Sequence, residues 1–209
     1  PRTRRVLKTR PRTAAVPFPA RSLSHAMTSR PESLLSSAFL APDAWRLEPA
    51  LLAGLLVAAI VYVRGFRPLH RALPERFPRA RVAAFAGGLA TLWIALASPL
   101  DALAGLSLQA HMLQHLLLTM VAPPLLLLAA PFAPLLRGLP RGIRQDALGP
   151  FLASPALQRL ARRLVHPVTG WLALAVATWL WHLPAAYELA LSSPAWHALE
   201  HGCFFVSAV

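Results

Sequence analysis

Charged residues are scarce in this chain, because Asp, Glu, Lys and Arg make up only 14% of its 209 residues. A soluble domain ordinarily carries about 25% charged residues, which keep its surface solvated. Hydrophobic residues reach 56%, and the mean hydropathy is +0.50. This composition argues against a soluble enzyme and predicts an integral membrane protein with the lipid bilayer as its solvent.

Cysteine and acidic residues are also in short supply. Cys203 is the only cysteine, which excludes an internal disulfide framework and a thiolate cluster built by one copy. The chain has eight acidic residues and 21 Lys and Arg, which give a formal charge of +13 and a pI near 11.8. Such a balance can indicate nucleic-acid binding. Here the arginines gather in an N-terminal tail and in loops between apolar segments, so we expect no nucleic-acid partner.

The two ends of the chain look unusual. Residues 1–26 contain seven basic residues and no acidic one, and they lack the apolar core of a signal peptide. We expect residues 1–44 to be a basic, disordered tail. Met27 looks like a more natural start than Pro1, which would make residues 1–26 translated upstream sequence. Residues 45–209 are predicted to form a membrane domain that is C-terminally truncated, because Val209 ends the chain inside an apolar run.

Long apolar segments predict an all-α fold, a polytopic transmembrane helix bundle. Four complete segments span residues 49–63, 82–98, 110–136 and 167–183, and a fifth begins near residue 195. A spanning helix needs about 20 residues, so the fifth segment is too short to be complete. Pro123 and Pro124 fall within the third segment, where the loss of two backbone donors predicts a bend.

Arginine is distributed unequally between the connecting loops. Loops 64–81 and 137–163 contain six arginines each, whereas the connections 99–110 and 184–195 contain no Lys or Arg. Loops rich in Lys and Arg remain on the cytoplasmic side of a membrane. We therefore expect the two arginine-rich loops to be cytoplasmic and the other two connections to lie on the outer face.

Five histidines gather at the predicted outer face. His111 with His115, and His197 with His201, are spaced four residues apart, which places each pair on one side of its helix. Imidazole binds copper, zinc, nickel and iron, and a nearby thioether favours Cu(I). A histidine near a helix end can also simply face interfacial water, but polar groups inside apolar helices generally indicate function. The candidate metal-binding residues are His111, His115, His182, His197, His201, Met112 and Glu200.

Three other interpretations use the same residues. His197, Glu200 and His201 fit the His-x-x-Glu-His pattern of inverted zinc peptidases. A b-type haem protein could use two axial histidines on facing helices, for instance His115 with His182. A scaffold that holds other subunits would need no metal at all.

Several motifs resemble a known family. The stretch Ser-Pro-Leu-Asp begins at Ser98 and Gln-Ala-His-Met-Leu-Gln-His begins at Gln109; Trp-His-Leu-Pro begins at Trp181 and Trp-His-Ala-Leu-Glu-His at Trp196. Over about residues 45–209 the chain resembles the CtaG-like family of caa(3)-type cytochrome c oxidase assembly factors. Within these motifs, the residues of this sequence that match are His111, Met112, Gln114, His115, Trp181, His182, Pro184, His197, Glu200 and His201.

The resemblance implies a non-enzymatic, multi-pass protein of the bacterial inner (plasma) membrane, in a family that usually has about seven spanning helices. It implies cytochrome c oxidase subunits as partners, with a copper chaperone as a further one. It also implies that the outward-facing histidines help copper reach the oxidase. Whether those histidines bind copper, bind haem or form a docking surface stays open at this point.

Overall fold

The computed structural model describes Trp45 and residues 48–209, and the predicted tail, residues 1–44, lies outside this part of the chain. Helices account for all the regular secondary structure within the described residues. The all-α prediction is therefore confirmed.

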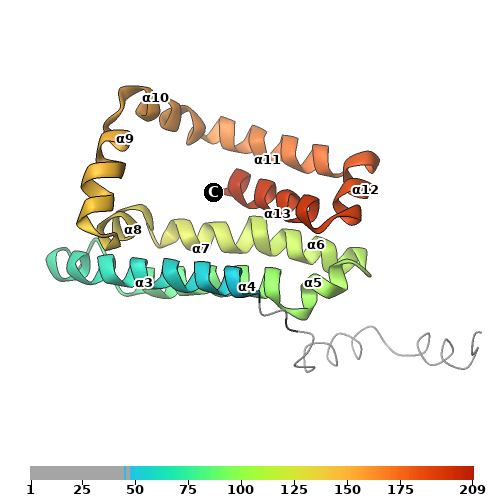
Figure 1. Ribbon diagram of the computed structural model, residues 1–209, viewed down its shortest axis with the longest axis horizontal. Coiled ribbons are helices and arrows are strands. Elements are labelled where there is room, and N and C mark those ends of the chain that lie inside the picture. Colours follow the sequence, from blue (N-terminus) through green and yellow to red (C-terminus); the bar gives the residue numbers. More distant parts are fainter. Residues whose placement is uncertain (1–44, 46–47) are drawn as a thin grey trace, which may run out of the picture. The chain divides into compact units, whose positions relative to one another are not determined.

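The first two long helices are α3 (Pro49–Ala72) and α4 (Ala80–Ala97), and both are long and apolar enough to cross a membrane. They pack against each other and are joined by a short turn (Figure 1). Helix α3 extends well past the predicted boundary at residue 63 and includes Arg64, Arg67 and Arg71. Arginine forms helices readily, so much of the predicted loop 64–81 is a helical extension of the first span.

The third candidate span covers Leu108–Leu128. It consists of α6 (Leu108–Leu116), a π-helical turn η2 (Leu117–Val121) and α7 (Ala122–Leu128). The amide of Ala122 donates to the carbonyl of Leu117, five residues earlier. The wider π turn makes room just before Pro123 and Pro124, whose rings would otherwise crowd the carbonyls of the preceding turn.

The predicted third segment, residues 110–136, is longer than the span that forms. The chain turns at Ala130, which has a φ of 46°, and then enters α8 (Phe132–Gly138). A positive φ is unusual for a residue with a side chain. The apolar run is therefore divided between a spanning helix and a short helix that packs back against α3.

The remaining helices are shorter. They are α5 (Pro99–Ala104), η3 (Ile143–Leu148), α9 (Gly149–Ala153), α10 (Pro155–Leu164), α11 (Pro167–Trp181), α12 (Pro184–Ser192) and α13 (Pro194–Ala208). Helices α10 and α11 meet at 65°, so the described residues hold three candidate spans, or four if this bent pair counts as one. The chain is a helical membrane protein with three to four candidate spans, a coarser result than the predicted four complete spans and a fifth.

Two clusters of buried side chains hold the helices together. Tyr62 is fully buried, donates a hydrogen bond from its hydroxyl to the carbonyl of Ala129 (2.9 Å), and stacks on Phe85 with ring centroids 3.9 Å apart. The second cluster joins Trp181 of α11 with Phe204 of α13. Helix α13 packs against α11, α12 and η2, which brings its histidines towards those of α6.

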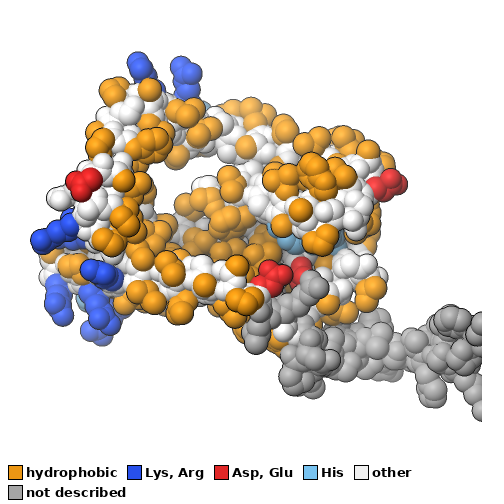
Figure 2. All heavy atoms as spheres, in the orientation of Figure 1, with side chains coloured by type: hydrophobic (Ala, Val, Ile, Leu, Met, Phe, Trp, Pro, Cys, Tyr) orange, Lys and Arg blue, Asp and Glu red, His pale blue; other side chains and the backbone are white. Residues whose placement is uncertain are grey.

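Basic side chains and histidines lie towards opposite ends of the described helices. Figure 2 shows Lys and Arg at one end of the described bundle, whereas the histidines are seen near the other end, with an apolar surface between. Many of the exposed side chains are large and hydrophobic, including Leu56 (61% exposed), Ile60 (57%) and Val176 (62%). An apolar band between two polar ends is the surface expected of a protein that crosses a bilayer.

Candidate metal centre

Four histidines from two helices face one another. His111 and His115 project from α6, and His197 and His201 project from α13. Within each helix the ring centroids are 4.2 Å apart. Between the helices, the ring centroids of His111 and His197 are 5.9 Å apart, and those of His115 and His201 are 5.6 Å apart. The sequence placed each pair on one helix face, and the structure brings the two faces together.

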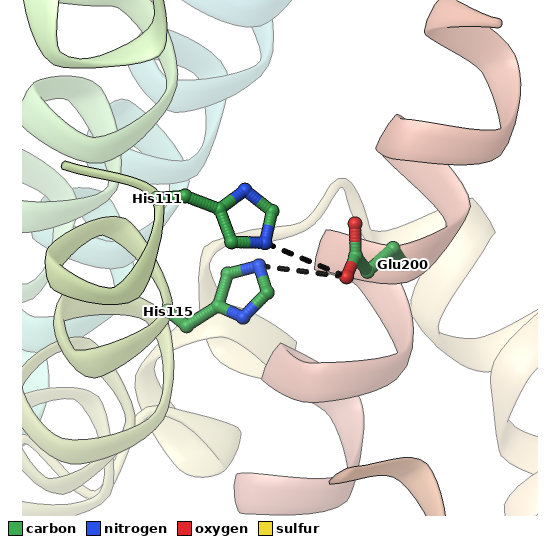
Figure 3. Close-up of side chains that lie close together, drawn as sticks. All are labelled: His111, His115 and Glu200. Atoms are coloured by element: carbon green, nitrogen blue, oxygen red, sulfur yellow. Dashed lines mark ion pairs between the residues drawn. The ribbon is translucent and has the colours of Figure 1, made fainter. Parts of the chain in front are cut away.

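The carboxylate of Glu200 points towards His111 and His115 (Figure 3), and it also approaches His197. One carboxylate oxygen, Oε1, is 3.7 Å from Nε2 of His115 and 3.9 Å from Nε2 of His111. The other, Oε2, is 3.5 Å from Nδ1 of His197. Glu200 is only 1% exposed. A buried carboxylate is costly unless positive charge or hydrogen bonds compensate it, so this position calls for a cationic partner.

The spacing of the donor atoms suits a metal ion. One ligand atom each from His111, His115 and Glu200 all lie within 4.8 Å of one another. Two nitrogen or oxygen donors, each about 2.0–2.2 Å from an ion, can be no more than about 4.4 Å apart. The 3.7 and 3.9 Å separations already fall within this limit, so an ion would require only small side-chain movements.

Unpaired polar atoms at the cluster support the same conclusion. Native proteins rarely bury a polar atom without a partner. Within the described residues, the buried cluster atoms that have no hydrogen-bond partner are Nδ1 of His111, Nδ1 and Nε2 of His115, Oε2 of Glu200 and Nε2 of His201. Imidazole nitrogens and carboxylate oxygens are metal ligands, so the residues present fit a bound cation.

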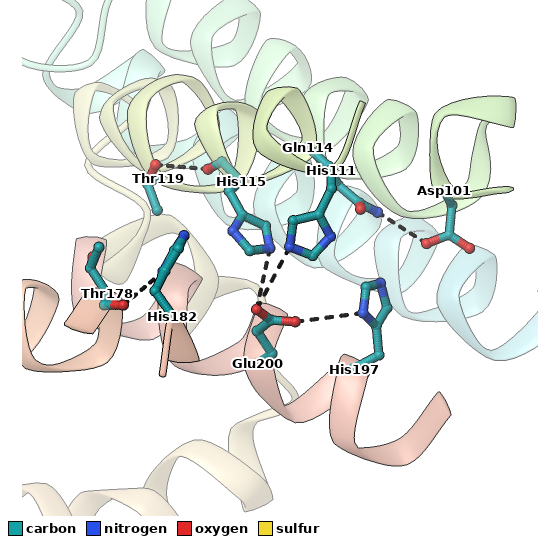
Figure 4. A network of polar contacts seen from close by, with 9 residues as sticks. All are labelled: Asp101, His111, Gln114, His115, Thr119, Thr178, His182, His197 and Glu200. Atoms are coloured by element: carbon teal, nitrogen blue, oxygen red, sulfur yellow. Dashed lines mark hydrogen bonds and ion pairs between the residues drawn. The ribbon is translucent and has the colours of Figure 1, made fainter. Parts of the chain in front are cut away.

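Hydrogen bonds fix the orientation of α6. The side-chain amide of Gln114 donates to the carbonyl of Ala95 (2.7 Å) and to Oδ1 of Asp101 (3.0 Å), which ties α6 to α4 and α5. The hydroxyl of Thr119 donates to the carbonyl of His115 (2.7 Å). Figure 4 shows the contacts of Gln114 with Asp101 and of Thr119 with His115. The anchoring role of Gln114 was missed in the sequence analysis, although a glutamine inside an apolar helix was the available signal.

His182 and Met112 are exposed, unlike His111, His115, His201 and Glu200, which are buried. His182 is exposed at the end of α11, with its ring centroid 6.3 Å from that of His115 and its Nδ1 2.7 Å from the carbonyl of Thr178. Met112 is 40% exposed, because successive residues on a helix point about 100° apart and His111 faces the cluster. Of the seven predicted residues, the structure brings five into one cluster. His182 lies at the edge of this cluster, and Met112 lies on an exposed side of α6. The five clustered residues are His111, His115, His197, His201 and Glu200.

Comparison with known proteins gives a family match. The family described as cytochrome c oxidase caa3 assembly factor matches residues 60–209. Two uncharacterized proteins, one from Mycobacterium bovis and one from Mycobacterium tuberculosis, are each 28% identical over 148 residues, which is 69% of this chain and 22% of their own length. The chain therefore spans about a fifth of the length of these curated relatives. No solved structure matches it.

Proposed function

Because the chain belongs to the family of cytochrome c oxidase caa3 assembly factors, we propose that it helps insert copper into the oxidase through its histidine cluster. Family membership supports a non-enzymatic role in assembly and implies an oxidase partner. The observation that carries the proposal is the buried carboxylate of Glu200 among His111, His115 and His197. A membrane protein has little reason to bury these groups together unless they bind a cation.

We assign the inner ligand set to His111, His115, His197, His201 and Glu200. Imidazole suits copper in both oxidation states, and the carboxylate also lets the site accept Cu(II). Five donors exceed what one ion requires, so the ion can exchange ligands while it remains bound. His182 is the further ligand at the exposed edge, and the thioether of Met112 is a soft contact for Cu(I) during release.

The proposed placement in the membrane follows from the two polar ends. The arginine-rich segments 64–81 and 137–163 lie on the cytoplasmic side, and the histidine cluster lies at the outer face of the plasma membrane. We propose four complete spans and part of a fifth, surrounded by the lipid bilayer. At the outer face the protein meets cytochrome c oxidase subunits, and it receives copper from a copper chaperone.

The packing favours copper over the two other metal-based functions. Phe204 is 2% exposed, and its ring centroid lies 4.4 Å from that of His115 and 6.2 Å from that of His182. A haem between these two histidines would have to displace Phe204. A zinc peptidase would need Glu200 to activate water in an open cleft, whereas Glu200 is 1% exposed.

The proposal can be tested in cells that lack the gene. The full-length protein, or a variant with His111, His115, His197 and His201 replaced by alanine, would be returned to them. We expect the variant to accumulate in the membrane but to leave the oxidase short of copper, with partial rescue by added copper. The control His166→Ala, which changes an exposed histidine at the arginine-rich end, should restore assembly fully. Full assembly with the four-histidine variant would contradict the copper role.

A further inference from the structure

A second polar site lies at the arginine-rich end of the molecule. It is a pocket of about 460 Å³ lined by Arg64 and Pro68 of α3, Arg137 of α8, Arg144 of η3, and Leu139 and Arg141 between them. Four of its six lining residues are arginines and none is acidic. Its lining residues come from sequence segments separate from those of the histidine cluster.

A close helix contact lies beside two of these arginines. Helices α3 and α8 cross at Gly65 and Gly138, where a Cβ on Gly65 would collide with the backbone of Pro134 and a Cβ on Gly138 with the backbone of Val61. Arg64 and Arg137 directly precede these two glycines. The close backbone contact at the glycines therefore holds the backbones of Arg64 and Arg137 near the crossing of α3 and α8.

No ion pair within the described part of the chain involves the arginines of the pocket. The ion-pair distances found there join histidines to Glu200, and none joins Arg64, Arg137, Arg141 or Arg144 to a carboxylate. Like charges held together repel each other, and the repulsion is relieved when an anion binds between them. Guanidinium groups bind phosphate oxygens in a bidentate geometry. The pocket therefore has the chemistry of a phosphate site.

A shallow apolar depression on the surface of α3 adjoins the pocket, and below it is called the groove. It is lined by Ala59, Ile60 and Val63 together with Arg64 and Arg67, and it shares Arg64 with the pocket. Ile60 and Val63 precede Arg64 on the helix, so the groove runs from the arginines towards the middle of the candidate span. A water-soluble phosphate would use only the arginines, whereas a phospholipid would also place an acyl chain in the groove.

We propose that this pocket binds the phosphate of an anionic glycerophospholipid, with one acyl chain lying along the groove at Ile60. Basic pockets between membrane helices on the cytoplasmic side are suited to anionic headgroups. The lipid phosphate offsets part of the positive charge of the four arginines at this pocket. This site is independent of the copper role proposed above.

The test uses the full-length protein, native mass spectrometry, and three separate probes: phosphatidylglycerol, phosphatidylcholine and inorganic phosphate. The variant is Arg137→Gln/Arg141→Gln. Its matched control, Arg76→Gln/Arg79→Gln, removes two exposed arginines from the turn between α3 and α4. We expect wild type and control to retain phosphatidylglycerol in preference to phosphatidylcholine, and the variant to bind it at least about tenfold more weakly.

Any one of four outcomes would overturn the proposal. Equal loss of lipid in the variant and the control would show a general charge effect rather than a site. Inorganic phosphate that binds as tightly as the lipid, or equal retention of the two lipids, would exclude the anionic lipid as the ligand. If the double variant fails to fold, Arg141→Gln serves instead, because Arg141 is exposed and its loss disturbs no packing. An unchanged lipid preference in that folded variant would count against the site.

Discussion

Replacing Glu200 with glutamine tests the centre of the copper site. The change keeps the shape of the side chain and removes its charge. Oε1 of Glu200 lies 3.7 and 3.9 Å from the nearest nitrogens of His115 and His111, so a copper ion between them would be in direct contact with the carboxylate. Two unit charges 4 Å apart attract by about 4 kcal/mol at an effective dielectric constant near 20.

The cost of keeping the carboxylate buried offsets part of that attraction. We therefore expect Glu200→Gln to weaken copper binding by at least about 10- to 100-fold, because changing even a group that only supports a metal ligand has an effect of this size. The assay is competition for copper between the purified protein and a chelator of calibrated affinity. Glu188→Gln is the matched control, because Glu188 is an exposed glutamate of α12. An affinity within twofold of wild type for Glu200→Gln would refute the assignment of Glu200 as a ligand.

Two further predictions concern packing and the edge of the site. Gly138→Ala should lower the free energy of unfolding in detergent by about 1–3 kcal/mol, because the new methyl group meets the backbone of Val61. Gly54→Ala, where the added methyl group meets nothing within 4 Å, should instead be neutral or stabilise the protein slightly. Equal changes in the unfolding temperature of the two variants would contradict the close contact at Gly138. His115→Ala should reduce copper affinity more than about 100-fold and His182→Ala less than about tenfold, so the reverse order would place the ion near α11.

Local sequence patterns predicted the parts of the site but not how they meet. The four-residue spacing of His111 with His115, and of His197 with His201, follows from helix geometry alone. That α6 and α13 face each other depends on the packing of α13 against α11, α12 and η2. The sequence singled out Glu200 as a candidate ligand, but its place between both histidine pairs required the structure.

The boundaries of the membrane helices were harder to predict. Hydropathy ended the first segment at residue 63 because arginines follow, yet α3 continues to Ala72. In the third segment the uniform apolar run hid the turn at Ala130, which separates α7 from α8. Hydropathy records the solvent that a segment prefers, whereas these boundaries depend on backbone geometry and on the crossing of α3 and α8.

The most direct test of the copper site is the copper content of the purified full-length protein after copper loading and dialysis, measured by inductively coupled plasma mass spectrometry. The comparison sample replaces His111, His115, His197 and His201 with alanine. The proposed site predicts roughly one copper ion per chain in the native protein and none in the variant. Equal copper in both samples, or none in the native protein, would contradict a copper site at this cluster.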